Sequence, residues 1–186
     1  MQYRTRIFRR FSRKSCCVIL YVSDKNQYYP KMLIRKAKYT EHQKLTEISF
    51  ESKGYWDYPD EYFDIWRNEL TITAEYINIH RVYVAEIQES VVGYYSIVNL
   101  PQDIEVSGIF INKGFWLEHM FILPSFIGKR IGTNMVSHLI KVCNDNNIKQ
   151  ISVLADPNSK TFYEKMGFQY EKEYPSTING RSTPLL

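Results

Sequence analysis

Two ionisable side chains stand in an otherwise apolar stretch of the chain, residues 115–123. One is Glu118, and a carboxylate on a buried strand is costly unless it is paired or has a function. We therefore weigh a general base, which takes a proton from an ammonium directly or through water, against a salt bridge to a Lys or Arg. The other is His119, an alternative base or a hydrogen-bonded core histidine. Successive strand residues face opposite sides, so only one of the two faces a cleft unless a bulge intervenes.

The segment after this stretch could bind an anion. Pro124 and a glycine-bearing turn lead into an apolar helical pattern that opens near Gly132. The N–H groups of such a turn and of the first helical residues point to one place, where the helix dipole favours negative charge. Glycines at a helix start are weak evidence alone, but Lys129 and Arg130 add cations suited to phosphate. The predicted anion-binding residues are Gly128, Lys129, Arg130, Ile131, Gly132 and Thr133.

A second segment combines a strand end with a short helix. Residues 155–158 read Ala-Asp-Pro-Asn, and residues 162–168 read Phe-Tyr-Glu-Lys-Met-Gly-Phe. By itself Asn158 is a turn or helix N-cap residue. Tyr163 is one of 15 tyrosines and by itself would be taken for a core residue. Residue type alone therefore gives neither side chain a chemical role.

The hydrophobic pattern predicts the elements that would hold these residues. Strands are expected over 33–37, 81–88, 91–100, 108–111, 115–123, 151–155 and 168–174. Helices are expected from Thr40 to Gly54, from about Asp60, over 73–79, from about 128 to 144, and in a short piece that carries 162–168. Thr40 and Gln43 form a capping-box pattern. Strands 81–88 and 91–100 form a hairpin, whose turn type stays open because the favoured Asn-Gly pair is absent. The helix that connects 115–123 to 151–155 predicts that these two strands are parallel.

Together the two chemistry-bearing segments resemble the GNAT superfamily of N-acetyltransferases. The resemblance covers about 32–186, and the C-terminal segments, with Pro-Ser at 175–176 and Gly-Arg at 180–181, resemble one bacterial branch. It implies an α+β fold of three layers, α/β/α, with a mixed, mostly antiparallel sheet in which the parallel strands 115–123 and 151–155 splay apart. The chain departs from the family's loop pattern at Ile127, where Gln or Arg is usual, and at Arg130, where a first glycine is usual.

The resemblance also implies roles for individual residues. Acetyl-CoA would be the acyl donor, with its pyrophosphate on the loop 128–133. Its pantetheine arm would pair like an added strand with the open edge formed by Met120, Phe121 and Ile122, and Asn158 would reach the cofactor. Tyr163 would lie near the CoA sulfur and protonate the departing thiolate.

The positive charge of the chain is concentrated at its N-terminus. The net charge is +4, but residues 1–31 carry eight basic residues against one acidic residue, and the remainder carries −3. We expect 1–31 to be a basic arm, disordered or an over-extended start, and 32–186 to be the GNAT domain. A nucleic-acid or membrane-surface tail and a targeting segment are the alternatives.

Cysteine usage and hydropathy indicate the setting. The three cysteines have no CxxC or metal-ligand spacing, which predicts a reducing, cytoplasmic setting and no metal. No apolar run reaches the roughly 18–20 residues of a membrane span. Nothing outside the basic arm favours nucleic-acid binding, so no membrane or nucleic-acid partner is expected, and a homodimer stays open.

The function that these features predict is acetyl transfer from acetyl-CoA to a primary amine, of a small molecule or a peptide, by direct attack in a ternary complex. Glu118 would be the base and Tyr163 the acid. The alternative is a CoA-binding regulatory or interaction protein without transfer activity, which the changed loop residues leave open. The acceptor cannot be read from the sequence, although rings and acids in one region would suit a cationic amine. They are Tyr55, Trp56, Asp57, Tyr58, Asp60, Glu61, Tyr62 and Trp66.

Overall fold

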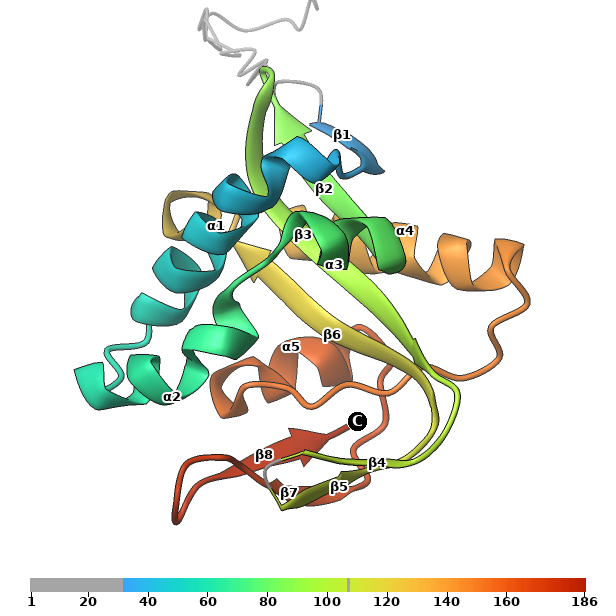
Figure 1. Cartoon of the computed structure of the whole chain (residues 1–186). Helices are drawn as coiled ribbons and strands as arrows, with labels where there is room; N and C mark the ends of the chain where they lie inside the picture. Colours follow the sequence, from blue (N-terminus) through green and yellow to red (C-terminus); the bar gives the residue numbers. More distant parts are fainter. Residues whose placement is uncertain (1–31, 107) are drawn as a thin grey trace, which may run out of the picture.

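A computed structural model describes residues 32–106 and 108–186 (Figure 1). At its centre is a four-stranded antiparallel sheet in the order β1-β2-β3-β6. The strands are β1 (Met32–Lys36), β2 (Arg81–Ile87), β3 (Ser90–Leu100) and β6 (Gly114–Ile122). Residues 91–98 of β3 are all buried, as expected for a strand covered on both faces. The basic arm predicted over 1–31 lies outside the described residues.

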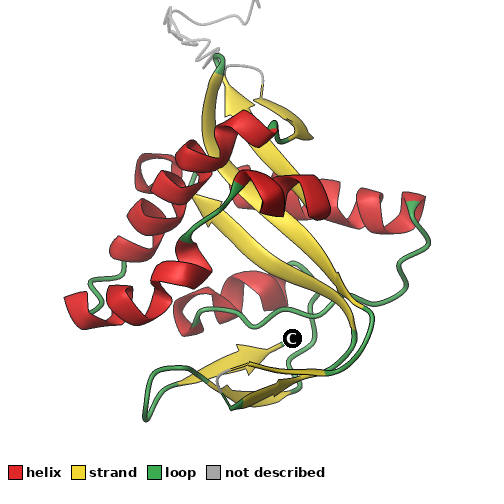
Figure 2. Cartoon of the chain, viewed as in Figure 1, coloured by secondary structure: helices red, strands yellow, loops and turns green. Residues whose placement is uncertain are grey.

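Helices cover both faces of the sheet and give the predicted three-layer arrangement (Figure 2). One layer contains α1 (His42–Gly54), α2 (Asp60–Leu70) and α3 (Ala74–Ile79), and the other contains α4 (Ile131–Asp145) and α5 (Lys160–Lys165). Leu45 and Ile48 of α1 pack with Val84, whereas Met135 of α4 packs with Ala85. Val84 and Ala85 thus point to opposite layers, as strand alternation requires. Within 32–106 and 108–186, no helix has the length and apolarity of a membrane span.

Two small hairpins lie at one end of the molecule (Figure 1). β4 (Ile104–Val106) pairs with β5 (Ile109–Ile111), and β7 (Lys172–Pro175) pairs with β8 (Ser182–Leu185). Both hairpins meet around Trp116, which packs with Ile109, Ile111 and Tyr174. The Tyr174 hydroxyl also donates a hydrogen bond to the carbonyl of Phe110. The start of β6 is therefore held between the two hairpins.

β6 and the segment 151–155 run parallel, as predicted, but they pair at a single point. The Leu117 N–H donates to the Ser152 carbonyl at 2.8 Å, and the Ser152 N–H donates to the Phe115 carbonyl at 3.0 Å. Beyond Ser152 the segment pairs with the end of the chain, through Val153 and Leu186. Residues 151–155 therefore do not form a regular strand. After the bridge, this segment and β6 splay apart.

Other details of the predicted elements are also wrong. Thr40 does not cap α1: it lies in a 3-10 turn (Tyr39–Glu41), where the Glu41 carboxylate accepts a 2.7 Å hydrogen bond from the Lys38 N–H. The strand expected over 168–174 begins only at Lys172. β4 and β8 were not predicted, and β8 contains Pro184, a residue that is uncommon within strands.

The β2–β3 hairpin has a turn of type I′. Its two central residues, Gln88 and Glu89, have φ of 49° and 63°. Positive φ at both positions defines this turn, which Asn and Gly adopt most readily. The turn type therefore follows the right-handed twist of the flanking strands, although Gln and Glu do not favour positive φ.

Candidate active site

A β-bulge at Glu118 interrupts the pairing of β6 with β3. Two consecutive residues of β3 pair with Leu117 and His119, so Glu118 has no partner on that strand. The extra residue breaks the alternation of side chains. Glu118 and His119 consequently reach the same hydroxyl, that of Tyr76 on α3, at 2.5 Å from Glu118 Oε2 and 3.0 Å from His119 Nδ1. Glu118 is exposed and forms no ion pair within the described residues.

His119 is held in the core as a neutral imidazole. Its Nε2 lies 2.9 Å from the backbone carbonyl oxygen of Glu69, which can only accept, so the proton is on Nε2. Nδ1 then accepts a hydrogen bond, and Ser96 Oγ lies 3.0 Å away. Burial lowers the pKa of His119, which keeps the ring uncharged at neutral pH. His119 was predicted to be either an alternative base or a hydrogen-bonded core histidine. Because both of its ring nitrogens are hydrogen-bonded, the structure favours the core histidine.

Beyond the bulge, β6 has a free edge that faces the segment 151–155. The Leu123 N–H bonds to β3 at 2.9 Å, and the Phe121 carbonyl oxygen also faces β3, at Gly93. Because backbone groups alternate along a strand, the N–H and C=O groups of Met120 and Ile122 point to the other edge. No residue of the described ranges pairs with them there. Of the three residues predicted at this edge, two therefore present their backbone to it.

The turn before α4 leaves a group of backbone N–H groups unpaired. Gly128 and Arg130 have φ of 79° and 61°, so Arg130 takes the left-handed conformation for which glycine is usual. The first hydrogen bond of the helix runs from the Asn134 N–H to the Arg130 carbonyl, at 3.1 Å. The N–H groups of residues 131–133 therefore have no partner within the helix. This geometry supports the anion cradle expected from the sequence.

Gly132 lies where this cradle meets α5 and β6. A Cβ at this position would lie 3.1 Å from Phe162 Cζ and 3.3 Å from Ile122 Cδ1, so glycine permits the close approach. The Lys129 side chain is at the rim, with Nζ 4.7 Å from the centroid of the Phe126 ring. The backbone N–H of Lys129 donates a hydrogen bond to the Phe126 carbonyl at 3.3 Å. Lys129 can therefore bind an anion only through its side chain.

Tyr163 reaches the site from α5. It is only 6% exposed and packs edge-on against Phe162 and Phe168, with ring centroids 5.3 Å away in both cases. Burial first, and then the charge of Asp156, raises the pKa of its phenol. The hydroxyl is therefore protonated at neutral pH and can donate into the cavity that Tyr163 lines.

A cluster of charged residues that the sequence analysis missed lies beside Tyr163. Asp156 accepts hydrogen bonds from Lys53 Nζ at 2.6 Å and from the Tyr58 hydroxyl at 2.8 Å, and its Oδ2 is 3.3 Å from Arg181 Nη2. Lys53 Nζ lies 4.3 Å from the centroid of the Trp66 ring. The three charged side chains are only 13–14% exposed. Lys53 and Arg181 are 103 and 25 residues from Asp156, so no local spacing could have linked them.

The cluster stabilises the charged form of Asp156, but it does not stabilise the charged form of Lys53. Burial alone would raise the pKa of Asp156, but the charge of Lys53 and hydrogen bonds from Lys53 and Tyr58 outweigh it and lower the pKa. For Lys53 the balance is opposite, since burial lowers its pKa despite the attraction of Asp156. Asn158 joins the cluster by donating its N–H to Asp156 and its amide to Tyr58, both at 3.0 Å, in the turn role expected for it.

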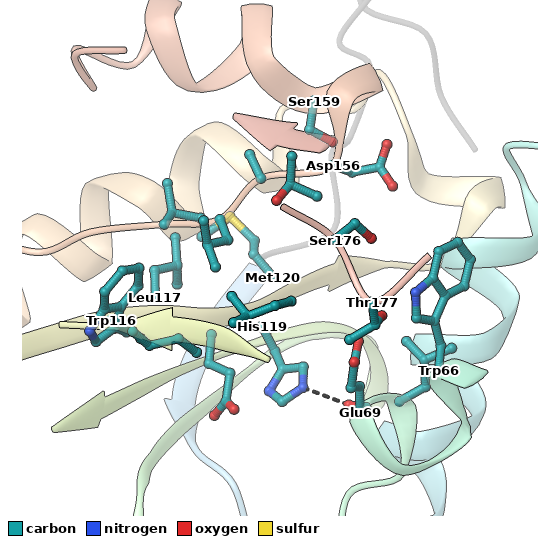
Figure 3. Close-up of a pocket in the computed structure, with 18 of the residues that line it drawn as sticks. Trp66, Glu69, Trp116, Leu117, His119, Met120, Asp156, Ser159, Ser176 and Thr177 are labelled. Carbon is teal, nitrogen blue, oxygen red and sulfur yellow. Dashed lines mark hydrogen bonds between the residues drawn. The ribbon is translucent and has the colours of Figure 1, made fainter. Parts of the chain in front are cut away.

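Lys53, Asp156 and Arg181 line a cavity of about 420 Å³ (Figure 3). Trp116 and Trp66 lie toward its opposite ends, with His119 between them and Asp156 and Ser159 above. Glu118, Met120 and Tyr163 also line it. The site thus brings together the predicted base, the predicted acid and the free edge of β6.

The acids predicted to favour a cationic amine are not in this cavity. Trp56 and Trp66 line it, but Asp57, Asp60 and Glu61 do not. Tyr58 and Tyr62 pack edge-on against Trp66, at centroid distances of 5.2 and 5.4 Å. The acidic side chain that α2 contributes to the cavity is Glu69, which follows Trp66 by nearly one helical turn.

The chain is similar to known acetyltransferases in sequence profile and in fold. Residues 78–170 match the sequence profile of the acetyltransferase (GNAT) domain. The matched range contains the positions of Glu118, the cradle at 128–133, Asn158 and Tyr163. Among curated protein sequences, the chain has no significant match.

Solved structures share the fold at low sequence identity. PaiA N-acetyltransferase from Thermoplasma acidophilum, in complex with coenzyme A, has a TM-score of 0.63 at 18% identity, over 83% of this chain and 97% of that one. A GNAT family acetyltransferase from Brucella melitensis, in complex with acetyl-CoA, has 0.52 at 18%, over 77% and 85%. Glucosamine-6-phosphate N-acetyltransferase from Arabidopsis thaliana has 0.53 at 19%, over 80% and 99%. At these identities the likeness establishes the shared fold.

Proposed function

Since the chain belongs to the GNAT acetyltransferase family, we propose that it transfers the acetyl group of acetyl-CoA to a primary amine, by direct attack in a ternary complex. The observation that carries the proposal is the free edge of β6 at Met120 and Ile122. This edge leads from the cavity lined by Glu118 and Tyr163 to the N–H cradle over 128–133. A cosubstrate with a thioester at one end, amides along its arm and a pyrophosphate at the other fits that order.

The groups that would hold acetyl-CoA are mainly backbone groups. The N–H groups of residues 131–133, with the side chains of Lys129 and Arg130, would bind the pyrophosphate at the positive end of α4. The free N–H and C=O groups of Met120 and Ile122 would pair with the pantetheine amides as an added strand does. Because backbone groups dominate, Ile127 and Arg130 are compatible with this binding although they depart from the family's pattern.

Acetyl-CoA supplies an acetyl group activated as a thioester, and the chain supplies the proton transfers and the alignment. Glu118 accepts the proton of the acceptor ammonium, directly or through water. The N–H of Met120, on the free edge, is a donor for the carbonyl oxygen on which negative charge develops. Tyr163 protonates the CoA thiolate as it departs, since a phenol carries its proton at neutral pH and burial raises the pKa of this one further. Alignment of the two reactants accounts for much of the rate.

Two measurements on the full-length protein test this proposal. A ligand that binds only the folded state raises the melting temperature, so we expect acetyl-CoA to raise it. We also expect amines to cause acetyl-CoA-dependent release of free CoA thiol. A raised melting temperature without thiol release from any amine would favour the alternative, a CoA-binding protein without transfer activity. No shift at millimolar acetyl-CoA would refute both.

A further inference from the structure

One wall of the cavity is the inner face of the β4–β5 hairpin. Ile104 pairs with Ile111 and Val106 pairs with Ile109. Residues directly opposite each other in an antiparallel pair project from the same face, and all four of these side chains line the cavity. The outer face carries the remaining pair, Glu105 and Phe110, and neither lines the cavity. The hairpin thus presents a purely apolar surface to the site.

The apolar wall, the predicted base and the free strand edge follow one another along β6. Trp116 packs against Ile109 and Ile111 of the hairpin. Glu118 comes next, and Met120 marks the start of the free edge. At about 3.3 Å per strand residue, the distance from Trp116 to Met120 is roughly 13 Å, and the bulge shortens it. A small molecule that lies along this strand would contact all three regions at once.

The charges in the cavity favour a cation. Five charged residues line it, and two of them, Lys53 and Arg181, are engaged with Asp156. The other two acids, Glu69 and Glu118, have no ion-pair partner in the part of the chain that the structure describes. The formal charge of the lining is therefore −1.

Glu69 is exposed to solvent and lines the cavity, yet its surroundings raise the pKa of its carboxyl. Enclosure by the surrounding residues raises the pKa of Glu69. The charge of Lys53, a hydrogen bond with Thr177 and the charge of Arg181 lower it, and the charge of Glu118 adds a smaller rise. A cation placed between the two carboxylates would relieve both effects. The two acids that line the cavity without an ion-pair partner are therefore where we expect an ammonium to bind.

We propose that the acceptor is a primary amine with a single positive charge and an apolar body of alkyl or aromatic carbon. It would lie along β6, with its ammonium between Glu118 and Glu69 and its body on the inner face of the β4–β5 hairpin. The inference rests on the proposed function and names the class of its second substrate. A second ammonium would have to lie against the apolar wall, which is unfavourable. A carboxylate beside the amine would meet Glu69 and Glu118.

Tryptophan fluorescence can test this binding without any need for turnover. The chain has three tryptophans, and all three, Trp56, Trp66 and Trp116, line the cavity. The full-length protein with CoA would be titrated with matched ligands. Hexylamine is compared with hexamethylenediamine, which adds a second ammonium. Phenethylamine is compared with phenylalanine, which adds a carboxylate, and with phenethyl alcohol, which lacks the charge. We expect each simple amine to bind at least tenfold more tightly than its counterparts.

Two substitutions on one hairpin provide a matched pair. Val106 and Phe110 are 49% and 54% exposed, on its inner and outer faces, so a charged residue at either position leaves the buried core untouched. Val106→Lys places a cation on the cavity wall and should weaken hexylamine at least tenfold. Phe110→Lys should leave its affinity unchanged.

The outcomes separate this inference from the proposed function. Tighter binding of hexamethylenediamine or phenylalanine than of the simple amines, or equal losses in the two variants, would overturn the inference. Thiol release that is fastest with diamines or amino acids would overturn it as well, while acetyl transfer itself would stand. If acetyl-CoA binds and no amine releases thiol, the transfer proposal fails, and the order of amine affinities still decides what the cavity takes.

Discussion

The hydroxyl of Tyr76, on α3, lies 2.5 Å from a carboxylate oxygen of Glu118, which is 42 residues further along the chain at the bulge in β6. The same hydroxyl is 2.8 Å from Ser96 Oγ. A phenol has one proton, and the short distance to the carboxylate indicates that Glu118 receives it. Glu118 is therefore fixed on the solvent side of the strand by a residue from another layer, and Tyr76 is a positioning residue for the predicted base.

Tyr76→Phe should lower kcat/KM for the amine and leave the affinity for acetyl-CoA unchanged. The substitution keeps the ring and removes the donor to Glu118. A hydrogen bond to a charged group contributes roughly 1.5–3 kcal/mol, so we expect a loss of about tenfold to a hundredfold. The measurement is thiol release against amine concentration. Tyr39→Phe, at an exposed position, is the control. A variant that loses only thermal stability would show that Tyr76 has no part in positioning the base.

Tyr163→Phe separates packing from proton donation. If Tyr163 only packs against Phe162 and Phe168, removal of one hydroxyl leaves turnover nearly unchanged. If its phenol protonates the thiolate, kcat should fall by roughly 10²–10⁴-fold, as for the loss of a general acid. Acetyl-CoA affinity should change little in either case. Tyr170→Phe, an exposed tyrosine nearby in sequence, is the control, and wild-type kcat in Tyr163→Phe would remove Tyr163 from the mechanism.

Periodic patterns predicted most of the fold because each depends on local sequence. Burial of one face of an element appears in the sequence as a regular spacing of apolar residues. Examples are the β2–β3 hairpin, the apolar β6, and the helical spacing of Ile131, Met135 and Leu139. The cradle could be predicted for the same reason, since its strand, turn and helix start are consecutive. Segment 151–155 was harder, because its partners are β6 at one residue and the end of the chain at the others.

The parts of the site that depend on tertiary pairing could not be predicted. The bulge at Glu118 is a matter of register between β6 and β3, and nothing in the sequence marks the extra residue. The ion cluster at Asp156 joins side chains from α1 and from the chain just before β8. Glu69 reads as an ordinary exposed residue of an amphipathic helix until α2 is placed over the cavity.

Gly132→Glu should abolish the rise in melting temperature that acetyl-CoA causes. The substitution places bulk and negative charge among the N–H groups of the cradle, and its Cβ would crowd Phe162 at 3.1 Å. Gly54→Glu is the control, because a Cβ at Gly54 has no neighbour within 4 Å. The measurement is the melting temperature with and without acetyl-CoA. The melting temperature of the unliganded variant reports the crowding separately, and an undiminished shift would rule out the cradle as the pyrophosphate site.

Asp156→Asn should destabilise the protein at neutral pH and much less in acid. The substitution keeps the shape of the side chain but leaves Lys53 and Arg181, each 14% exposed, without their counter-charge. Removal of one partner from a buried ion pair costs about 3–5 kcal/mol. For a chain of this size that corresponds to a fall in melting temperature of roughly 6–20 °C.

The pH dependence of this loss follows from the lowered pKa of Asp156. A carboxyl whose pKa is lower in the folded state stabilises the fold above its unfolded value, here 3.8, and that contribution is lost as pH falls through the folded value. The difference in melting temperature between the wild type and Asp156→Asn should therefore be constant above about pH 5 and shrink below the unfolded value. Asp64→Asn, which removes the acid of an exposed pair with Arg67, should have almost no effect at either pH. An equal loss in acid and at neutral pH would mean that Asp156 acts through its shape and hydrogen bonds rather than through its charge.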